Sequence, residues 1–249
     1  MSLCLASNFP INIIWGPDAI QIYNSGYRIV CGQAHPRAVG ESFERAQRGE
    51  TSFLENQRIF INRNGYLEET FFTFSLSPIL DENGEVAGLF HPVTETTGTM
   101  LTQRRTRALK DVTDNASKVE SVAEATKIIV QSLVAYSLDI PFIAFFSVDS
   151  TNQSVKLVAH AGVSDTQKLQ NLDLNFFKFA SNGKSGLSIN QIDNVENYFG
   201  KIPSGEYPEL VERAFIIEIK TRGSENSNAF VVVGLSRRLP LDENYRNAW

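Results

Sequence analysis

Cysteine is scarce in this chain of 249 residues, which contains only Cys4 and Cys31. Two isolated cysteines cannot supply a disulfide framework or a metal site built from several thiolates. We therefore expect two reduced thiols and no metal centre.

Long apolar runs and an excess of positive charge are also missing. No segment approaches the roughly 18 consecutive apolar residues of a membrane span, and the N-terminal sequence MSLCLASNFP lacks the basic segment that begins a signal peptide. The formal net charge is −5, whereas a nucleic-acid surface requires a basic face. We expect a cytoplasmic protein that binds neither membrane nor nucleic acid. The hydrophobic content of 42% is enough for one large or two ordinary domains.

Motifs for catalysis are missing as well. The three histidines are His35, His91 and His160. None is followed by the acidic residue and Arg-Thr-Pro-like turn that a phosphoacceptor histidine requires, and no glycine-rich ATP lid is present. The run Gly183-Lys184-Ser185-Gly186 lacks the first glycine of a phosphate-binding loop and is interpreted as an ordinary loop. We predict no catalytic residue and no enzymatic activity.

Residues 53–97 contain the clearest structural pattern in the chain. Three runs rich in β-branched and aromatic residues are separated by links that end in Asn64-Gly65 and Asn83-Gly84. Asn-Gly pairs favour type I′ hairpin turns, so the segment predicts an antiparallel three-stranded meander. Alternation along the middle strand places Phe72 on the core face with Thr70, Phe74 and Leu76, and Thr73, Ser75 and Ser77 on the wetter face.

Shorter elements precede the meander. Residues 11–15 and 19–23 are predicted strands, and residues 27–38 are predicted to form short helices and turns around His35-Pro36. Residues 41–48 are a predicted helix that ends at Gly49, where a glycine favours helix termination.

This order of two strands, a short helical middle and three strands resembles a PAS domain over residues 12–97. The sequence is similar to the PAS domains that open a group of multi-domain sensor histidine kinases. The motifs that carry the resemblance are Trp15-Gly16-Pro17, Tyr23-Asn24, His35-Pro36, Leu67-Glu68-Glu69, Phe72-Thr73-Phe74-Ser75 and Ser77-Pro78. This chain lacks the longer Trp-containing helical segment that follows the His-Pro motif in those relatives and forms pocket wall.

Candidate pocket residues follow from the resemblance and from the pattern. His35 is the one candidate for a haem ligand, with a histidine that caps a turn before Pro36 as the alternative. Phe72, Phe74 and Phe90 form an aromatic face that is interpreted either as the lining of a hydrophobic pocket or as ordinary core. With no reactive cysteine in a flavin-binding context, we predict no bound cofactor.

Residues 98–136 are helical in pattern, with mostly apolar residues in an alternating spacing of about 3.5 residues. One interpretation is a signalling helix that pairs in a homodimer. The other is two helices, a basic linker and then the first helix of the next domain from Ser117. The candidate dimer seam comprises Leu101, Ala108, Val112, Asn115, Val119 and Val122.

The remaining residues predict a second domain. A hairpin over residues 142–159, a mixed middle and a hairpin over residues 214–235 follow the helix, and this order resembles a GAF domain. Residues 237–246, RRLPLDENYR, resemble the segment that begins the last helix of GAF domains in the same kinases. We expect that helix to continue beyond Trp249, so that the GAF domain is truncated here.

The predicted fold class is α+β, with a PAS domain at 11–97, a helical linker at 98–117 and a truncated GAF domain at 118–249. The resemblance implies a five-stranded antiparallel sheet with short helices, followed by an antiparallel sheet flanked by helices. It further implies a non-catalytic sensory input module of a two-component phosphorelay histidine kinase. Its partners would be a second copy, a downstream kinase module, a response regulator or an unknown small ligand. The alternative is a free-standing scaffold that binds protein partners.

Overall fold

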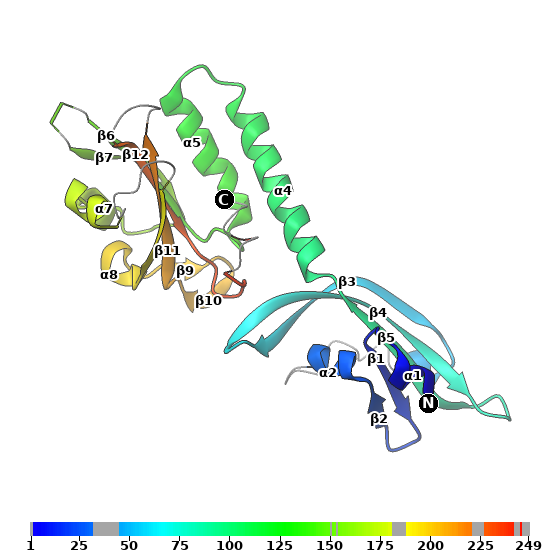
Figure 1. Cartoon of the computed structure of the whole chain (residues 1–249). Coiled ribbons are helices and arrows are strands. Elements are labelled where there is room, and N and C mark those ends of the chain that lie inside the picture. Colours follow the sequence, from blue (N-terminus) through cyan, green and yellow to red (C-terminus); the bar gives the residue numbers. More distant parts are fainter. Residues whose placement is uncertain are drawn as a thin grey trace. The chain divides into compact units, whose positions relative to one another are not determined.

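The computed structural model describes residues 2–31, 45–149, 151–152, 154–180, 188–220, 227–241 and 245. The chain divides into two compact units, Met1–Arg104 and Arg105–Trp249. Figure 1 shows each unit built around one large sheet. None of the helices in the described part of the chain combines the length and the apolar character needed to cross a bilayer.

The described strands of the first unit form a five-stranded antiparallel sheet in the order β2-β1-β5-β4-β3. The predicted order of elements is confirmed, since two strands and a helix precede a three-stranded meander. Residues 45–47 are helical and residue 48 lies in a turn, whereas residues 41–44 of the predicted helix lie outside the described residues. The elements are α1 (Ser2–Ala6), β1 (Ile11–Trp15), β2 (Ile20–Tyr23), α2 (Ser25–Cys31), β3 (Ser52–Arg63), β4 (Tyr66–Leu80) and β5 (Val86–Glu95).

The two hairpin links of this meander differ from each other. Asn64 and Gly65 have φ angles of 57° and 84°, as a type I′ turn requires. In the second link only Gly84 has a positive φ, at 82°, and its N–H donates to the carbonyl of Asp81 over 3.1 Å. The carboxylate of Asp81 also accepts from two backbone N–H groups of the link. The prediction of a type I′ turn is therefore wrong at Asn83-Gly84, because the Asp81 side chain organises a longer turn.

Strand β4 has one apolar and one wetter face, as alternation predicted. Phe72, Phe74 and Leu76 are at most 4% exposed, whereas Thr73, Ser75 and Ser77 are half-buried. Phe72 and Phe74 pack with Tyr27 of α2 in a cluster that also contains Ile61 and Val93. Helix α2 therefore covers part of the apolar face of the sheet.

The second unit contains another described five-stranded antiparallel sheet, in the order β7-β6-β12-β11-β8. A small hairpin of β9 and β10 is separate from it. The strands are β6 (Ile143–Val148), β7 (Val155–Ala161), β8 (Ser188–Asp193), β9 (Pro203–Ser204), β10 (Tyr207–Leu210), β11 (Arg213–Lys220) and β12 (Ser227–Gly234). The helices are α5 (Val122–Leu133), η2 (Val134–Tyr136), α6 (Thr166–Gln170), α7 (Leu174–Ala180) and α8 (Val195–Phe199).

Apolar side chains pack on both faces of this second sheet. On one face α5 contributes Val130 and Leu133 to a cluster with Ile143 and Val233. On the other face Phe177 of α7 stacks on Phe230 with ring centroids 4.6 Å apart, inside a larger cluster of buried apolar residues. The predicted α+β class is confirmed: both units combine antiparallel sheets with short helices.

Two sequence-based expectations for the second unit were incomplete. The mixed middle predicted between the two hairpins contains Phe199, Ile202 and Tyr207, which are buried to 6% exposure or less. Strand β8 was not predicted, although it pairs with β11 from Arg213 to Glu218. Its two apolar residues, Ile189 and Ile192, lie three positions apart and do not follow the two-residue period of a strand, so the local signal is weak and the pairing with β11 defines the strand.

Helix α4 (Thr97–Ala116) follows β5 and contains residues of both units. The helical pattern predicted over residues 98–136 is interrupted between α4 and α5, where residues 117–121 form a turn. The structure therefore has two helices in this region, and the single uninterrupted helix is not observed.

Gly162 and Gly98 provide a matched test of backbone constraint. Gly162 has a φ of +76°, and a Cβ there would lie 2.2 Å from the carbonyl oxygen of Pro141, whereas a Cβ at Gly98 in α4 meets nothing within 4 Å. We expect Gly162→Ala to lower the free energy of unfolding by more than about 1 kcal/mol. Gly98→Ala should leave it unchanged or raise it by up to about 1 kcal/mol. Urea unfolding followed by circular dichroism measures both, and equal effects would contradict this assignment.

Candidate functional site at the start of helix α4

Two adjacent glutamates of β4, Glu68 and Glu69, are almost completely buried, at 3% and 0% exposure. Successive residues of a strand point to opposite faces of the sheet, so the two carboxylates lie on different faces. A buried carboxylate is costly unless a charged partner and hydrogen bonds compensate for it. Each glutamate meets this requirement with arginine.

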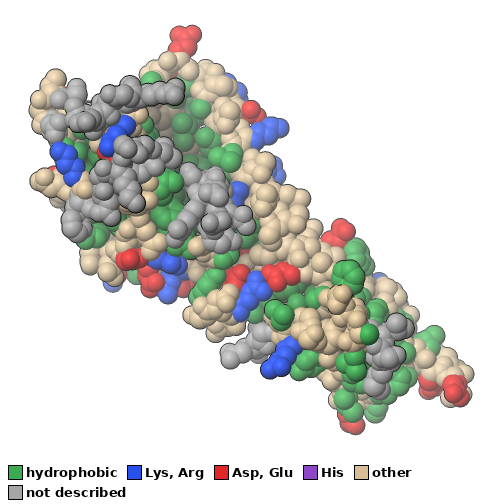
Figure 2. All heavy atoms as spheres, in the orientation of Figure 1, with side chains coloured by type: hydrophobic (Ala, Val, Ile, Leu, Met, Phe, Trp, Pro, Cys, Tyr) green, Lys and Arg blue, Asp and Glu red, His purple; other side chains and the backbone are tan. Residues whose placement is uncertain are grey.

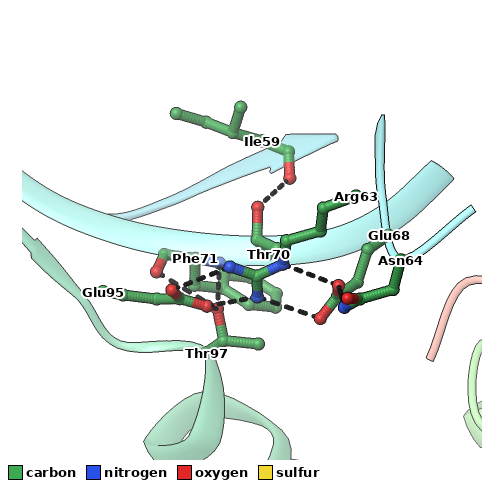
Figure 3. Close-up of polar contacts among 8 residues, drawn as sticks. All are labelled: Ile59, Arg63, Asn64, Glu68, Thr70, Phe71, Glu95 and Thr97. Carbon is green, nitrogen blue, oxygen red and sulfur yellow. Dashed lines mark hydrogen bonds and ion pairs between the residues drawn. The ribbon is translucent and has the colours of Figure 1, made fainter. Parts of the chain in front are cut away.

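Arg63 at the end of β3 binds Glu68 in a two-point contact (Figure 3). Its Nε lies 2.6 Å from Oε2 of Glu68, and its Nη2 lies 3.0 Å from Oε1. The same guanidinium binds Glu95 of β5, with Nη1 3.0 Å from Oε2 and Nη2 2.6 Å from Oε1. One arginine therefore joins three consecutive strands of the meander, and its planar fork suits two carboxylates at once.

Thr97 connects this network to the first turn of α4. Its hydroxyl donates to Oε1 of Glu95 over 2.8 Å and accepts from the backbone N–H of Phe71 over 2.9 Å. The backbone N–H of Thr96 also donates to the carbonyl of Phe71 over 2.7 Å. The beginning of α4 is thereby attached to the middle strand of the meander at both backbone and side-chain level (Figure 3).

Glu69 attaches a later turn of the same helix. Arg104 of α4 binds it with two hydrogen bonds, Nη2 to Oε2 over 2.8 Å and Nη1 to Oε1 over 3.2 Å. Arg58 of β3 adds an ion pair of 3.6 Å to Oε1. The two glutamates of β4 thus hold α4 at Thr97, through Glu68, Arg63 and Glu95, and at Arg104.

The hydrogen bonds between Arg63 and Glu95 favour the charged forms of these two residues. Burial on its own raises the pKa of Glu95, but hydrogen bonds from Arg63 and then Thr97 outweigh it and bring the pKa below its ordinary value. The pKa of Arg63 is raised, first by its hydrogen bonds to Glu68 and then by those to Glu95. Among the described residues no group of three or more His, Cys, Asp or Glu side chains could hold a metal ion. The arrangement can position a helix.

The predicted pocket residues do not form one lining. His35 lies outside the described residues. Phe72 and Phe74 belong to the packed core of the first unit. Phe90 pairs with Ser77 and so lies on the opposite face of the sheet, where it is 36% exposed. The proposed aromatic face of three phenylalanines is therefore corrected to two, because the β4–β5 register places Val93 and not Phe90 beside Phe74.

The core of the first unit instead contains His91, which sequence analysis did not assign to a site. It is 2% exposed, and its ring lies edge-on to Tyr27 and Phe74, with centroid distances of 5.8 and 5.4 Å. The alternation of buried Leu89, His91 and Val93 along β5 could have placed it on this face.

The predicted seam residues differ in how deeply they are buried in the chain. Leu101 and Ala108 are buried, at 4% and 0% exposure, whereas Val122 is 81% exposed. Val112 packs against the cluster on the α5 face of the second sheet, and the amide of Asn115 donates to the hydroxyl of Ser132 over 3.1 Å. Val119 is half-buried in the turn after α4. Pairing of two copies along this face remains a prediction.

Sequence analysis also missed the charged residues of the candidate site. Glu68 and Glu69 were recognised only as part of a family-like motif, and Arg63, Glu95 and Arg104 were not singled out. Two adjacent acids inside a run of strand-forming residues are a usable signal, because such a pair must place one carboxylate on the covered face of the sheet.

The charged side chains on the surface of the described part of the chain do not gather into a second candidate site. Figure 2 shows Lys and Arg interspersed with Asp and Glu over the visible face, with hydrophobic side chains between them. Exposed large apolar residues of the first unit include Trp15, Ile20 and Phe53.

No protein-family model matches the chain, and no curated protein matches it. Among solved structures, the GAF domain of a phosphoenolpyruvate-protein phosphotransferase from Acinetobacter shares 15% identity over 60% of this chain and 85% of that chain, with a TM-score of 0.39. The PAS domain of BvgS from Bordetella pertussis shares 18% identity over 44% of this chain and 92% of that chain, with a TM-score of 0.27. The chromophore-binding domain of a Stigmatella aurantiaca bacteriophytochrome shares 10% identity over 100% of this chain and 93% of that chain, with a TM-score of 0.38.

These neighbours are PAS, GAF and phytochrome domains, but their TM-scores are at most 0.39. The functional assignment therefore depends on the architecture and contacts of the chain itself.

Glu95 makes the stability of the first unit depend on pH in a defined direction. Its folded pKa lies below its ordinary value, which is about 4.3 in an unfolded chain, so the ionised carboxylate stabilises the fold above that pH. This contribution is lost as the pH falls through the lowered folded pKa. We expect Glu95→Gln to cost about 1 kcal/mol between about pH 5 and pH 8. The cost should shrink toward zero below about pH 4.

Urea unfolding at a series of pH values measures this difference. Glu85→Gln, at an exposed loop position, is the control and should give a small, flat difference. A cost of Glu95→Gln that does not change with pH would contradict the assignment.

Substitutions at Leu101 and Val122 test whether each residue is buried within a single chain or lies at an interface between two copies. Leu101→Asp places a charge at a buried position and should lower the free energy of unfolding by more than about 2 kcal/mol. Val122→Asp lies at an exposed helix start and should change it by no more than about 0.5 kcal/mol. If two copies pair along the predicted seam, Val122→Asp should also shift light-scattering mass toward the monomer. A stable, unaltered Leu101→Asp chain would contradict the buried placement.

Proposed function

We propose that this chain is a non-catalytic sensory and signal-relay input module of a two-component phosphorelay histidine kinase. In this proposal α4 transmits the signal. The resemblance of the sequence to the PAS and GAF domains of such kinases supports the assignment to that group. The structural support is the way in which α4 is attached.

The observation that carries the proposal is the pair of consecutive arginines in α4. Arg104 binds the buried Glu69 in the first unit, and Arg105 forms an ion pair with the buried Asp139 in the second unit, at 3.9 Å. An α-helix is a stiff element with a rise of about 1.5 Å per residue. A shift or rotation of α4 at Arg104 therefore also displaces the neighbouring guanidinium.

Signal input is then a change in how the first sheet holds α4. A ligand or partner that bound the core of the first unit could act only by favouring one arrangement of β4 and β5 over another. The carboxylates of Glu68, Glu69 and Glu95, together with the backbone of Phe71, hold the helix to these strands. A downstream kinase module is the proposed receiver, and the ligand would be a small molecule or a partner surface.

Glu69→Gln tests this role because it keeps the shape of the side chain but removes the charge that binds Arg104. In a fusion of this chain to a histidine-kinase core, we expect the variant to change the autophosphorylation rate about fivefold or more. Glu50→Gln is the matched control, since Glu50 pairs with Arg45 at an exposed position of the same unit.

Fusions with two junctions that lie two residues apart control for helix phase, since they present the kinase core at angles about 200° apart. Equal rates for wild type and Glu69→Gln at both junctions, with both kinases active, would contradict relay through α4. Labelled phosphate on the unfused chain after incubation with ATP would contradict its assignment as non-catalytic.

A further inference from the structure

The second unit contains a buried polar cluster that is separate from the network of Glu68 and Glu69. Arg105, Asp139 and Tyr245 are 5%, 0% and 1% exposed, and we call them the Arg105 cluster. They come from α4, from the turn that follows η2, and from the segment that follows β12. Three segments far apart in the sequence therefore meet at one buried point of this unit.

Tyr245 is the centre of the cluster. The guanidinium carbon of Arg105 lies 4.8 Å from the centroid of its ring, within the range of a cation–π contact. Its hydroxyl donates to the backbone carbonyl of Asp139 and accepts from the backbone N–H of Ser236 over 3.4 Å. The side chain thus binds α4 through its ring and the β12 end through its hydroxyl.

Arg105 is held less completely than its burial requires. Its Nε lies 3.9 Å from Oδ1 of Asp139, and within the described part of the chain neither Nε nor Nη2 has a hydrogen-bond partner. A buried guanidinium is costly when its N–H groups are unsatisfied. Its position therefore depends on the two long contacts to Asp139 and to the Tyr245 ring, and a modest displacement of α4 weakens both.

We propose that the Arg105 cluster couples the position of α4 to residues 235–241, which follow β12, so that a displacement of the helix reaches these residues directly. This inference rests on the proposed function, in which α4 is the transmitting helix. It adds the output route within the second unit: from Arg105 to the Tyr245 ring, and from the Tyr245 hydroxyl to Ser236. The sheet itself does not have to deform, because none of these residues belongs to one of its strands.

Hydrogen exchange measured by mass spectrometry on the unfused chain tests the coupling. The variants are Glu69→Gln, Tyr245→Phe and the double variant. Tyr245→Phe keeps the ring that faces Arg105 and removes the hydroxyl that binds Asp139 and Ser236. We expect Glu69→Gln to speed exchange of amides in residues 235–241 about fivefold. In the Tyr245→Phe background, Glu69→Gln should change the exchange rate of these amides by less than about twofold. Such non-additivity would not arise if Tyr245 had a merely structural role.

Controls separate this coupling from general loosening. Tyr198→Phe removes a half-exposed hydroxyl from the same unit and should leave the fivefold effect intact, and Arg107→Gln is the matched change at an exposed arginine of α4. Thermal unfolding by circular dichroism verifies each fold. Should Tyr245→Phe fail to fold, Arg105→Lys, which keeps the charge but loses the planar fork, replaces it in the same comparison.

Three outcomes would overturn the inference. An unchanged 235–241 segment in Glu69→Gln, with altered exchange in α5, refutes the cluster route while the relay through α4 stands. An equal Glu69→Gln effect in the Tyr245→Phe background likewise refutes the cluster route. If Glu69→Gln alters neither α5 nor residues 235–241, both the coupling and the relay through α4 are refuted.

Discussion

The burial of two adjacent carboxylates in β4 is the constraint on which the first unit depends. Strand geometry sends Glu68 and Glu69 to opposite faces, so no single cation can neutralise both. Arg63 pairs with Glu68 on one face, and Arg104 and Arg58 pair with Glu69 on the other. Since Arg104 belongs to α4, satisfying the buried charge of Glu69 fixes the helix against the sheet.

The same constraint explains why α4 begins where it does. Glu95 shares the guanidinium of Arg63 and accepts from the hydroxyl of Thr97, so the last residue of β5 and the first residue of α4 belong to one hydrogen-bonded group. Removing one member of a buried charge pair is far more costly than the net contribution of the pair. In the proposed relay, the strand-to-helix junction is the place where a change in the sheet is passed to the helix.

The second unit uses a different principle, with apolar packing on both faces of its sheet. Phe142, Phe177, Phe199 and Phe230 fill one face, while Val130 and Leu133 of α5 cover part of the other. Against this background Arg105 stands out, because its guanidinium is buried with two nitrogens that no described residue satisfies. Its neighbour Arg104 forms two hydrogen bonds with Glu69. Two consecutive arginines of one helix therefore differ in how fully their guanidinium groups are hydrogen-bonded.

Sequence alone determined the elements whose signals are local. The strands at 11–15 and 53–95, the Asn64-Gly65 turn, and the alternation of Phe72 and Phe74 with Thr73 all follow from dihedral preference and from the two-residue period of a strand. Tertiary structure decided the features that depend on register and on distant partners. Phe90 faces away from Phe74 because of the β4–β5 pairing, and Val112 and Asn115 of α4 have partners within the chain because α5 folds back after the turn at 117–121. Glu69 meets Arg104 across 35 positions of sequence, and no local pattern encodes a partner at that separation.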